Sequence, residues 1–228
     1  MRVPDLAGAI ESTLLAPGAT AADVERLCRE AAGAGVHGVC VSPCRVPEAL
    51  GFVEGTELRV VSVAGFPLGT AATRTKVAEV GHLVELGAHE VDMVINVGWV
   101  LEGRLTAVSH ELREARRASE GRVLKVILET GLLSSTQVRE AAALALGAGA
   151  DFLKTSTGYG PRGASLRDVR LLRQVAGSRC GVKAAGGIRS YNQAMGLLAA
   201  GADRIGTSAA RAILEEAAGP RGHHPPGG

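Results

Sequence analysis

The chain has 228 residues, a formal net charge of +2 at pH 7 and a hydrophobic share of 46%. This length fits one large domain or two small ones and allows a sizeable buried core. The near-zero net charge and the aromatic content of 3% give no sign of binding to nucleic acid or to a membrane surface, so neither is an expected partner.

The N-terminal residues and the cysteines indicate the compartment. Asp5 and Glu11 interrupt the region where a signal peptide would be apolar, and no apolar run reaches the roughly 18 residues of a membrane-spanning helix. The 4 cysteines form no CxxC pair and mostly occupy apolar contexts, so buried free thiols are expected rather than disulfides. We therefore expect a cytoplasmic protein.

Runs rich in β-branched residues alternate with alanine-rich amphipathic stretches along the chain. Thr20 begins the first of these stretches and has capping-box spacing to Asp23. Several amphipathic stretches end in a Gly-Ala pair, and a glycine there can take the left-handed conformation that ends a helix. The predicted strands cover residues 9–14, 36–41, 58–64, 90–96, 123–129, 152–155, 181–184 and 204–206.

Alternating strands and helices predict a parallel sheet, and eight such units predict an α/β fold of the (β/α)8 TIM-barrel type. We expect a single barrel domain over residues 1–218, followed by a disordered tail over residues 219–228. Functional residues of this fold gather where the strands end at their C-terminal side. Side chains at those positions are therefore the candidates for chemistry.

Lysine is rare in this sequence and is placed selectively. Of 25 basic residues only four are lysines, and Lys154 and Lys183 each end a short apolar run that leads into a glycine-bearing turn. A lysine amine becomes a nucleophile only when its pKa falls well below about 10.4, which burial and a nearby like charge both favour. The pair therefore indicates imine chemistry. The alternative is one phosphate-binding lysine and one ion-paired core lysine.

Asp92 lies within a predicted buried strand, where a charged carboxylate is costly unless it is paired or takes part in chemistry. Beside lysine amines it could transfer protons. The alternative is a structural ion pair with Lys183 or Lys125. Lys125 and Glu129 share a face of the next predicted strand, and we interpret them as a pair that fills the barrel interior.

Glycine-bearing loops follow the predicted sixth, seventh and eighth strands. Loops after strands seven and eight commonly bind phosphate in this fold, because their backbone N–H groups face the anion. The sequence contains neither HExxH nor GxSxG, the histidines show no metal-ligand clustering, and His37 and His89 precede strands on the face opposite the predicted site, so neither metal nor cofactor is expected. The candidate phosphate-binding residues are Gly158, Gly186, Gly187, Arg189, Gly206 and Ser208.

Five segments, taken together, resemble the signature segments of the deoxyribose-phosphate aldolase family, whose members are class I, imine-forming aldolases. The resemblance runs in order from about residue 10 to residue 215. The matching segments are residues 90–96 (EVDMVIN), 125–131 (KVILETG), 152–158 (FLKTSTG), 183–189 (KAAGGIR) and 204–208 (RIGTS).

The resemblance implies reversible cleavage of 2-deoxy-D-ribose 5-phosphate to acetaldehyde and D-glyceraldehyde 3-phosphate. It assigns Lys154 as the Schiff-base lysine, Lys183 as the second lysine that perturbs its pKa and transfers protons, and Asp92 as the acidic proton relay. Thr13 and Cys40 match positions near the substrate, although Cys40 could equally be a small buried apolar residue. The expected partners are a phosphosugar and aldehydes, with homo-oligomerisation to a dimer or tetramer.

Two departures from the family pattern stand out. The first strand usually reads Asp-His-Thr, whereas this chain has Glu11-Ser12-Thr13, which bears on orientation of the acceptor aldehyde rather than on imine formation. The C-terminal tyrosine of some members is absent, so reprotonation either relies on Asp92, Lys183 and water or is slower in this protein. Two other functions remain open: another imine-forming or phosphate-binding barrel enzyme, transaldolase-like or an isomerase, and a non-catalytic phosphosugar-binding protein.

Overall fold

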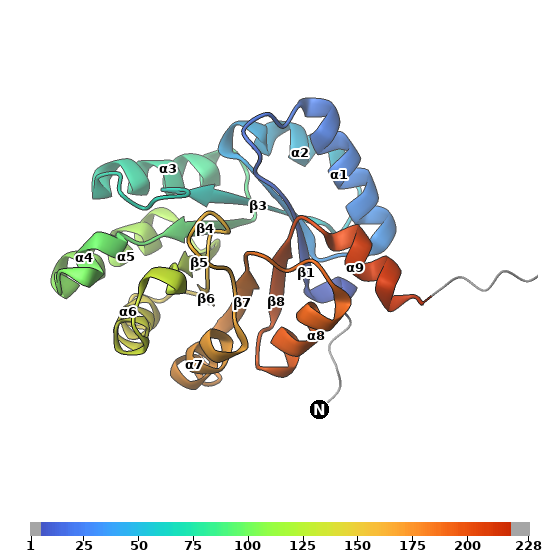
Figure 1. Cartoon of the computed structure of the whole chain (residues 1–228). Helices are drawn as coiled ribbons and strands as arrows, with labels where there is room; N and C mark the ends of the chain where they lie inside the picture. Colours follow the sequence, from blue (N-terminus) through green and yellow to red (C-terminus); the bar gives the residue numbers. More distant parts are fainter. Residues whose placement is uncertain (1–5, 220–228) are drawn as a thin grey trace, which may run out of the picture.

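The computed structural model describes residues 6–219 and forms a closed barrel of eight parallel strands in the order β1 to β8, with helices around the outside (Figure 1). This confirms the predicted α/β TIM-barrel class. The strands are β1 (Ile10–Leu14), β2 (Gly38–Val41), β3 (Arg59–Ala64), β4 (Glu90–Val94), β5 (Val123–Ile127), β6 (Phe152–Lys154), β7 (Gly181–Ala185) and β8 (Arg204–Thr207).

Helices connect consecutive strands, and one further helix follows β8. The α-helices are α1 (Ala21–Ala34), α2 (Val46–Phe52), α3 (Thr73–Glu85), α4 (Val97–Leu101), α5 (Leu105–Ala118), α6 (Ser135–Gly147), α7 (Leu166–Ala176), α8 (Tyr191–Ala199) and α9 (Ala210–Ala217). Short 3₁₀ turns are η1 (Ala7–Ala9), η2 (Pro43–Arg45) and η3 (Thr130–Leu132).

Local sequence signals account for most boundaries. The Thr20 side chain accepts from the backbone N–H of Asp23, whose carboxylate accepts from the backbone of Thr20, so the predicted capping box is confirmed. Each predicted strand is present, and no strand boundary differs by more than two residues. The predicted fourth strand was too long because Asn96 caps helix α4, where its side chain accepts from the backbone N–H of Trp99.

The apolar core lies between the strands and the surrounding helices. The barrel interior differs from it because apolar side chains fill only one part of the interior and charged side chains fill the rest. In the parallel register Cys40 aligns with Val61, and Val63 aligns with Asp92, so these residues point to the same face as Asp92. Cys40, Val61 and Val63 form a separate apolar cluster inside the barrel, against which Leu15 packs. The opposite half of the interior holds charged side chains.

Lysine occupies only buried positions in this fold, since Lys76 and Lys125 are 0% exposed, Lys154 is 3% exposed and Lys183 is 1% exposed. Among the described residues, none of the helices has both the length and the apolar character needed to cross a lipid bilayer. The predicted domain end at residue 218 stays a prediction, and residues 220–228 of the predicted tail lie outside the described residues.

Candidate functional site

Three lysines converge on one carboxylate inside the barrel. Strands β6 and β7 are neighbours, and their register places Lys154 directly beside Lys183. Asp92 Oδ2 accepts from Lys154 Nζ at 2.7 Å and from Lys183 Nζ at 2.6 Å. Asp92 Oδ1 accepts from Lys125 Nζ at 2.8 Å. The sequence left two roles open for Asp92, proton transfer or a structural ion pair. Its contacts with the three lysines are compatible with both roles.

The surroundings of Lys154 and Lys183 shift the pKa values of the two amines in opposite directions. Burial lowers the pKa of Lys154 and the positive charge of Lys183 lowers it further, although Asp92 pulls the other way. Burial also acts to lower the pKa of Lys183, but Asp92 and Glu11 outweigh it and hold that pKa above its ordinary value. Burial acts to raise the pKa of Asp92, yet three ammonium groups hold it well below the usual range. Lys154 is therefore the amine most easily deprotonated.

Glu11 explains much of this difference between the two amines. It is fully buried, and its carboxylate accepts a hydrogen bond from Lys183. Lys125 Nζ lies 3.4 Å from Glu11 Oε1. The link between the Glu11 position and orientation of the acceptor aldehyde stays a prediction. The contacts of Glu11 place it against Lys183, whose charge adds to burial in lowering the pKa of Lys154.

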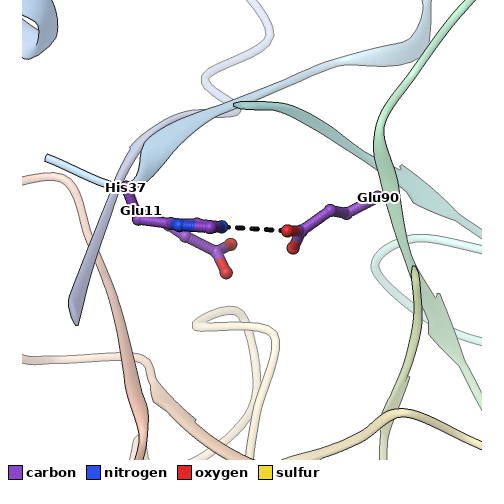
Figure 2. Close-up of side chains that lie close together, drawn as sticks. All are labelled: Glu11, His37 and Glu90. Carbon is purple, nitrogen blue, oxygen red and sulfur yellow. Dashed lines mark hydrogen bonds and ion pairs between the residues drawn. The ribbon is translucent and has the colours of Figure 1, made fainter. Parts of the chain in front are cut away.

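Glu11, His37 and Glu90 come together near the N-terminal ends of their strands, with possible ligand atoms within 4.8 Å of one another (Figure 2). A single histidine joins two carboxylates here, so this group does not contradict the expectation that the histidines do not cluster as metal ligands. Lys125 Nζ lies 2.5 Å from Glu90 Oε2, and Arg204 Nη1 lies 3.7 Å from Glu11 Oε1. Because these cations already neutralise the carboxylates, we interpret the group as an internal ion-pair network. The predicted absence of a metal stays a prediction.

The predicted pairing of Lys125 with Glu129 is wrong. Strand β5 ends at Ile127, and Glu129 has a left-handed backbone with φ 51°, so the two-residue alternation no longer applies. Glu129 instead accepts from the backbone N–H of Thr157 at 3.1 Å and from its hydroxyl group. It thereby shapes the loop that follows Lys154, while Lys125 binds Asp92 and Glu90.

A cavity of about 320 Å³ opens at the C-terminal ends of the strands, with Lys154 in its lining. Every candidate phosphate-binding residue lines this same cavity, and so does Thr13. Gly158, Gly186 and Gly187 have φ of 93°, 93° and 73°, a region that favours glycine. The structure thus brings together the residues that the sequence assigned to an amine and to a phosphate cradle. The lining glycines are Gly158, Gly186, Gly187 and Gly206, and the lining polar residues are Thr13, Lys154, Thr157, Tyr159, Arg189, Thr207 and Ser208.

Gly163 is a tight contact between two of these loops, and its replacement gives a specific expectation. A Cβ atom at Gly163 would lie 2.0 Å from the carbonyl oxygen of Gly186, so Gly163→Ala must displace the glycine pair. We expect the KM for a phosphosugar to rise about tenfold or more, a loss of about 1.4 kcal/mol of binding. Steady-state kinetics measure this change.

Gly147→Ala is the matched control, because a Cβ atom there meets nothing within 4 Å. It should leave KM within about twofold of the unaltered protein. An unchanged KM in Gly163→Ala would contradict the importance of the loop contact.

Cys40 and Tyr159 show where sequence reasoning differed from the structure. Cys40 lies inside the barrel and burial raises its thiol pKa to about 11, but it is not among the cavity-lining residues. Tyr159 was missed although it directly follows Gly158, and it lines the cavity. Arg204 begins the 204–208 segment, and its guanidinium group contacts Glu11 and Glu90. The sequence feature that could have identified Tyr159 is its position directly after the 152–158 segment, in the loop that carries Gly158.

A closed α/β barrel that holds a low-pKa lysine beside a second lysine and a carboxylate is suited to imine chemistry. Residues 8–216 match the DeoC/LacD family of aldolases. The deoxyribose-phosphate aldolase of Dictyoglomus turgidum is 44% identical over 210 residues, covering 92% of this chain and 96% of that protein. The deoxyribose-phosphate aldolase of Aciduliprofundum boonei is 46% identical over 217 residues, covering 94% of this chain and 98% of that protein.

Solved structures agree with this assignment. The tetrameric deoxyribose phosphate aldolase from Aeropyrum pernix superposes with a TM-score of 0.88 at 38% sequence identity, covering 94% of this chain and 92% of that chain. The chain therefore belongs to the DeoC/LacD family of aldolases, which confirms the resemblance identified from the sequence.

Proposed function

We propose that this protein is a class I aldolase that reversibly cleaves 2-deoxy-D-ribose 5-phosphate to acetaldehyde and D-glyceraldehyde 3-phosphate, a step of deoxyribonucleoside breakdown. The observation that carries the proposal is the contrast between Lys154, with its lowered pKa, and Lys183, with its raised pKa, on either side of one Asp92 oxygen. Family membership and the names of the relatives support the same reaction.

Lys154 supplies the nucleophile. Its neutral amine adds to the aldehyde carbon C1 of the open-chain sugar, and loss of water gives a protonated imine. The imine accepts the electron pair of the C2–C3 bond as the C3 hydroxyl loses its proton. D-Glyceraldehyde 3-phosphate leaves, and an enamine remains on Lys154. Protonation at C2 and hydrolysis of the resulting imine release acetaldehyde and regenerate the amine.

Asp92 and Lys183 move the protons in this proposal. Asp92 Oδ2 contacts both amines, at 2.7 Å to Lys154 and 2.6 Å to Lys183, so a proton taken from one can pass to the other. Lys183 is held protonated by its two buried carboxylate partners and can return the proton through Asp92 or water. The C-terminal tyrosine used by some family members is not required for this route.

The glycine loops after β6 and β7, together with Gly206 of β8 and Ser208 just beyond it, bind the phosphate end of the substrate in this proposal. Their left-handed glycines allow the backbone to approach closely, Ser208 can donate a hydrogen bond, and Arg189 adds positive charge. Lys154 lines the same cavity, so a five-carbon chain can join the amine to the cradle. Thr13 lines the cavity and would flank the reacting carbons, whereas Cys40 lies inside the barrel and does not line the cavity.

Reductive trapping tests the proposal directly. Borohydride added with deoxyribose 5-phosphate should reduce the imine and attach the carbon chain permanently to Lys154, which mass spectrometry of the digested protein detects. Lys125 and Lys183 are internal controls, because both are equally buried and bind the same carboxylate but have raised pKa values. Label on either control lysine, or no label at all, would contradict the assignment.

A panel of substrates separates the competing functions. A transaldolase-like enzyme would transfer a dihydroxyacetone unit, and an isomerase would interconvert phosphosugars without releasing acetaldehyde. A phosphosugar-binding protein would retain deoxyribose 5-phosphate without turnover. Release of acetaldehyde, measured by coupled reduction, supports the proposed reaction over these alternatives.

Two further expectations complete the proposal. A cytoplasmic location agrees with four free cysteines, of which Cys44 is the exposed one. A homo-oligomer, dimer or tetramer, is proposed by analogy with the tetrameric relative from Aeropyrum pernix. Light scattering of the purified protein measures its oligomeric state.

A further inference from the structure

The charged side chains inside the barrel form one connected set of ion pairs, which we call the interior network. Each member lies at most 4.0 Å from a member of opposite charge, with His37 paired to Glu90 through Nε2. Among the described residues, no ion pair links a member to a charged side chain outside the network. Its members are Glu11, His37, Glu90, Asp92, Lys125, Lys154, Lys183 and Arg204.

Three cations of the network stand in a row on adjacent strands. Lys183 on β7 aligns in register with Lys154 on β6 and with Arg204 on β8. Like charges placed side by side in a sheet destabilise it unless anions lie between them. Asp92 lies between the first two, because its Oδ2 contacts both lysines, and Glu11 contacts both Lys183 and Arg204. The row therefore depends on carboxylates from the opposite side of the barrel.

Arg204 contributes its charge to two carboxylates near the N-terminal ends of the strands. Its Nη1 atom lies 3.7 Å from Glu11 Oε1 and 4.0 Å from Glu90 Oε1. The guanidinium group also lies over the ring of Phe152, 5.5 Å from the ring centroid. Arg204 is thus held by packing and by charge, without a short ion pair to either carboxylate.

The surroundings fix the charge states of most members. Burial acts to raise the pKa of Glu90, but His37 and Lys125 outweigh it and lower that pKa to about 2. Burial acts to lower the pKa of Lys125, but its carboxylate partners outweigh it and hold the pKa above its ordinary value. The pKa values of Asp92 and Lys183 are shifted towards the charged forms in the same way. Arginine stays protonated in proteins, so these groups all carry their charges near pH 7.

The formal charges of the interior network cancel when Lys154 is neutral and His37 is uncharged. A proton on Lys154 is then the one positive charge without a negative counterpart, and an uncompensated buried charge is costly. Loss of that proton is therefore favoured by the network as a whole and not by Lys183 alone. The three anions are Glu11, Glu90 and Asp92, and the three other cations are Lys125, Lys183 and Arg204.

The other titratable groups beside the network leave this count unchanged. Burial lowers the pKa of His89, as do Arg59 and Arg122, and its Nδ1 accepts a backbone N–H, so the ring is neutral. The two arginines are exposed to solvent, which screens their charge. Burial raises the pKa of Cys40 to about 11, so its thiol is neutral as well. A proton on His37 would add one positive charge, so His37 needs a control of its own.

We propose that Arg204 and Glu90 are positioning residues that set how readily Lys154 gives up its proton, because they hold the interior network at the charge balance that a neutral Lys154 completes. No ion pair joins either of them to Lys154 among the described residues, so they act through the network. The proposal rests on the proposed role of Lys154 as the nucleophile and extends that role to residues outside the cavity lining.

The test removes one charge of each sign. Arg204→Gln leaves two cations against three carboxylates, so the network balances only with Lys154 protonated. The pH at which Lys154 is half protonated should then rise by about half a unit or more. Glu90→Gln leaves three cations against two carboxylates, and this midpoint should fall by a similar amount. The double variant restores the balance and should return the midpoint to that of the unaltered protein.

The small number of lysines makes this titration directly observable. The chain has four, so protein labelled with carbon-13 at lysine Cε gives four NMR signals, each of which shifts as its amine loses a proton. Lys154→Met identifies the Lys154 signal by its disappearance. The acid limb of kcat/KM for deoxyribose 5-phosphate should move in the same direction as the NMR midpoint in each variant.

Arg116→Gln is the matched control. The Arg116 side chain is 22% exposed against 20% for Arg204, and it pairs at 2.7 Å with Asp151, which directly precedes β6 but lies outside the network. It should leave the midpoint within about 0.2 pH units, because a solvent-exposed pair is screened. Both single variants are repeated with His37→Gln, and the two shifts should keep their opposite signs.

The outcomes separate the charge balance from a merely structural role. Shifts of the same sign in the two single variants, or loss of the opposite signs with His37→Gln, would overturn the proposal. If Arg204→Gln alone does not fold, the difference between Glu90→Gln and the double variant measures the same charge. Opposite shifts without borohydride trapping of Lys154 would overturn the aldolase function and leave the charge balance standing. Trapping of Lys154 with an unmoved midpoint would do the reverse.

Discussion

Lys154→Met should reduce kcat/KM for deoxyribose 5-phosphate on the order of 10⁴-fold or more, because the variant has no amine with which to form the imine. Methionine is similar in length, so the packing inside the barrel is largely preserved. The loss should appear in kcat, since the phosphate cradle remains intact. Steady-state assays with the coupled detection of acetaldehyde measure both constants.

A second variant separates charge from nucleophilicity. Lys154→Arg retains a positive group beside Asp92 but cannot form an imine, because the guanidinium stays protonated. It should be as inactive as Lys154→Met and should show no adduct after borohydride treatment. Activity retained in either variant at more than a few per cent would eliminate the imine mechanism.

Lys183→Met should lower kcat about 10²- to 10⁴-fold, the usual contribution of a positioned proton-transfer group. It should also move the acid limb of the pH profile. Lys154 is inactive when protonated, so kcat/KM falls as the pH drops through its pKa. The charge of Lys183 lowers that pKa, so removing the charge raises it and shifts the acid limb to higher pH.

The matched control for this shift is Lys125→Met. Lys125 is equally buried but contacts the other oxygen of Asp92. Its loss should disturb Asp92 while shifting the acid limb less than the loss of Lys183 does. The pH dependence of kcat/KM, which reports the free enzyme, measures both shifts. An acid limb that stays in place in Lys183→Met would contradict the coupling between the two amines.

The sequence predicted the barrel and the central chemistry because both depend on local patterns. Alternating β-branched runs and amphipathic stretches determine the order of strands and helices, and Lys154, Lys183 and Asp92 lie in or directly at the end of strands. Once the strands are parallel and consecutive, the ends of β6 and β7 must be adjacent. Their aligned lysines confirm this expectation.

The remaining contacts depend on closure and on loop geometry, which a local pattern does not contain. Glu11 reaches Lys183 only because β1 pairs with β8 and closes the barrel. Glu129 leaves the strand pattern because its backbone turns left-handed after Ile127. The Tyr159 hydroxyl group donates to the backbone oxygen of Leu15, although 144 positions separate the two residues in the sequence. No spacing rule within a single element predicts these three contacts.

The complete burial of lysine has a practical consequence for handling the protein. Reagents that acylate or cross-link exposed amines would find no lysine on the described outer surface, since each of the four lies within the fold. Biotinylation or resin attachment through lysine amines would therefore spare the folded barrel. Among the lysines, a small carbonyl reagent that enters the mouth would first meet the one amine that lines the cavity.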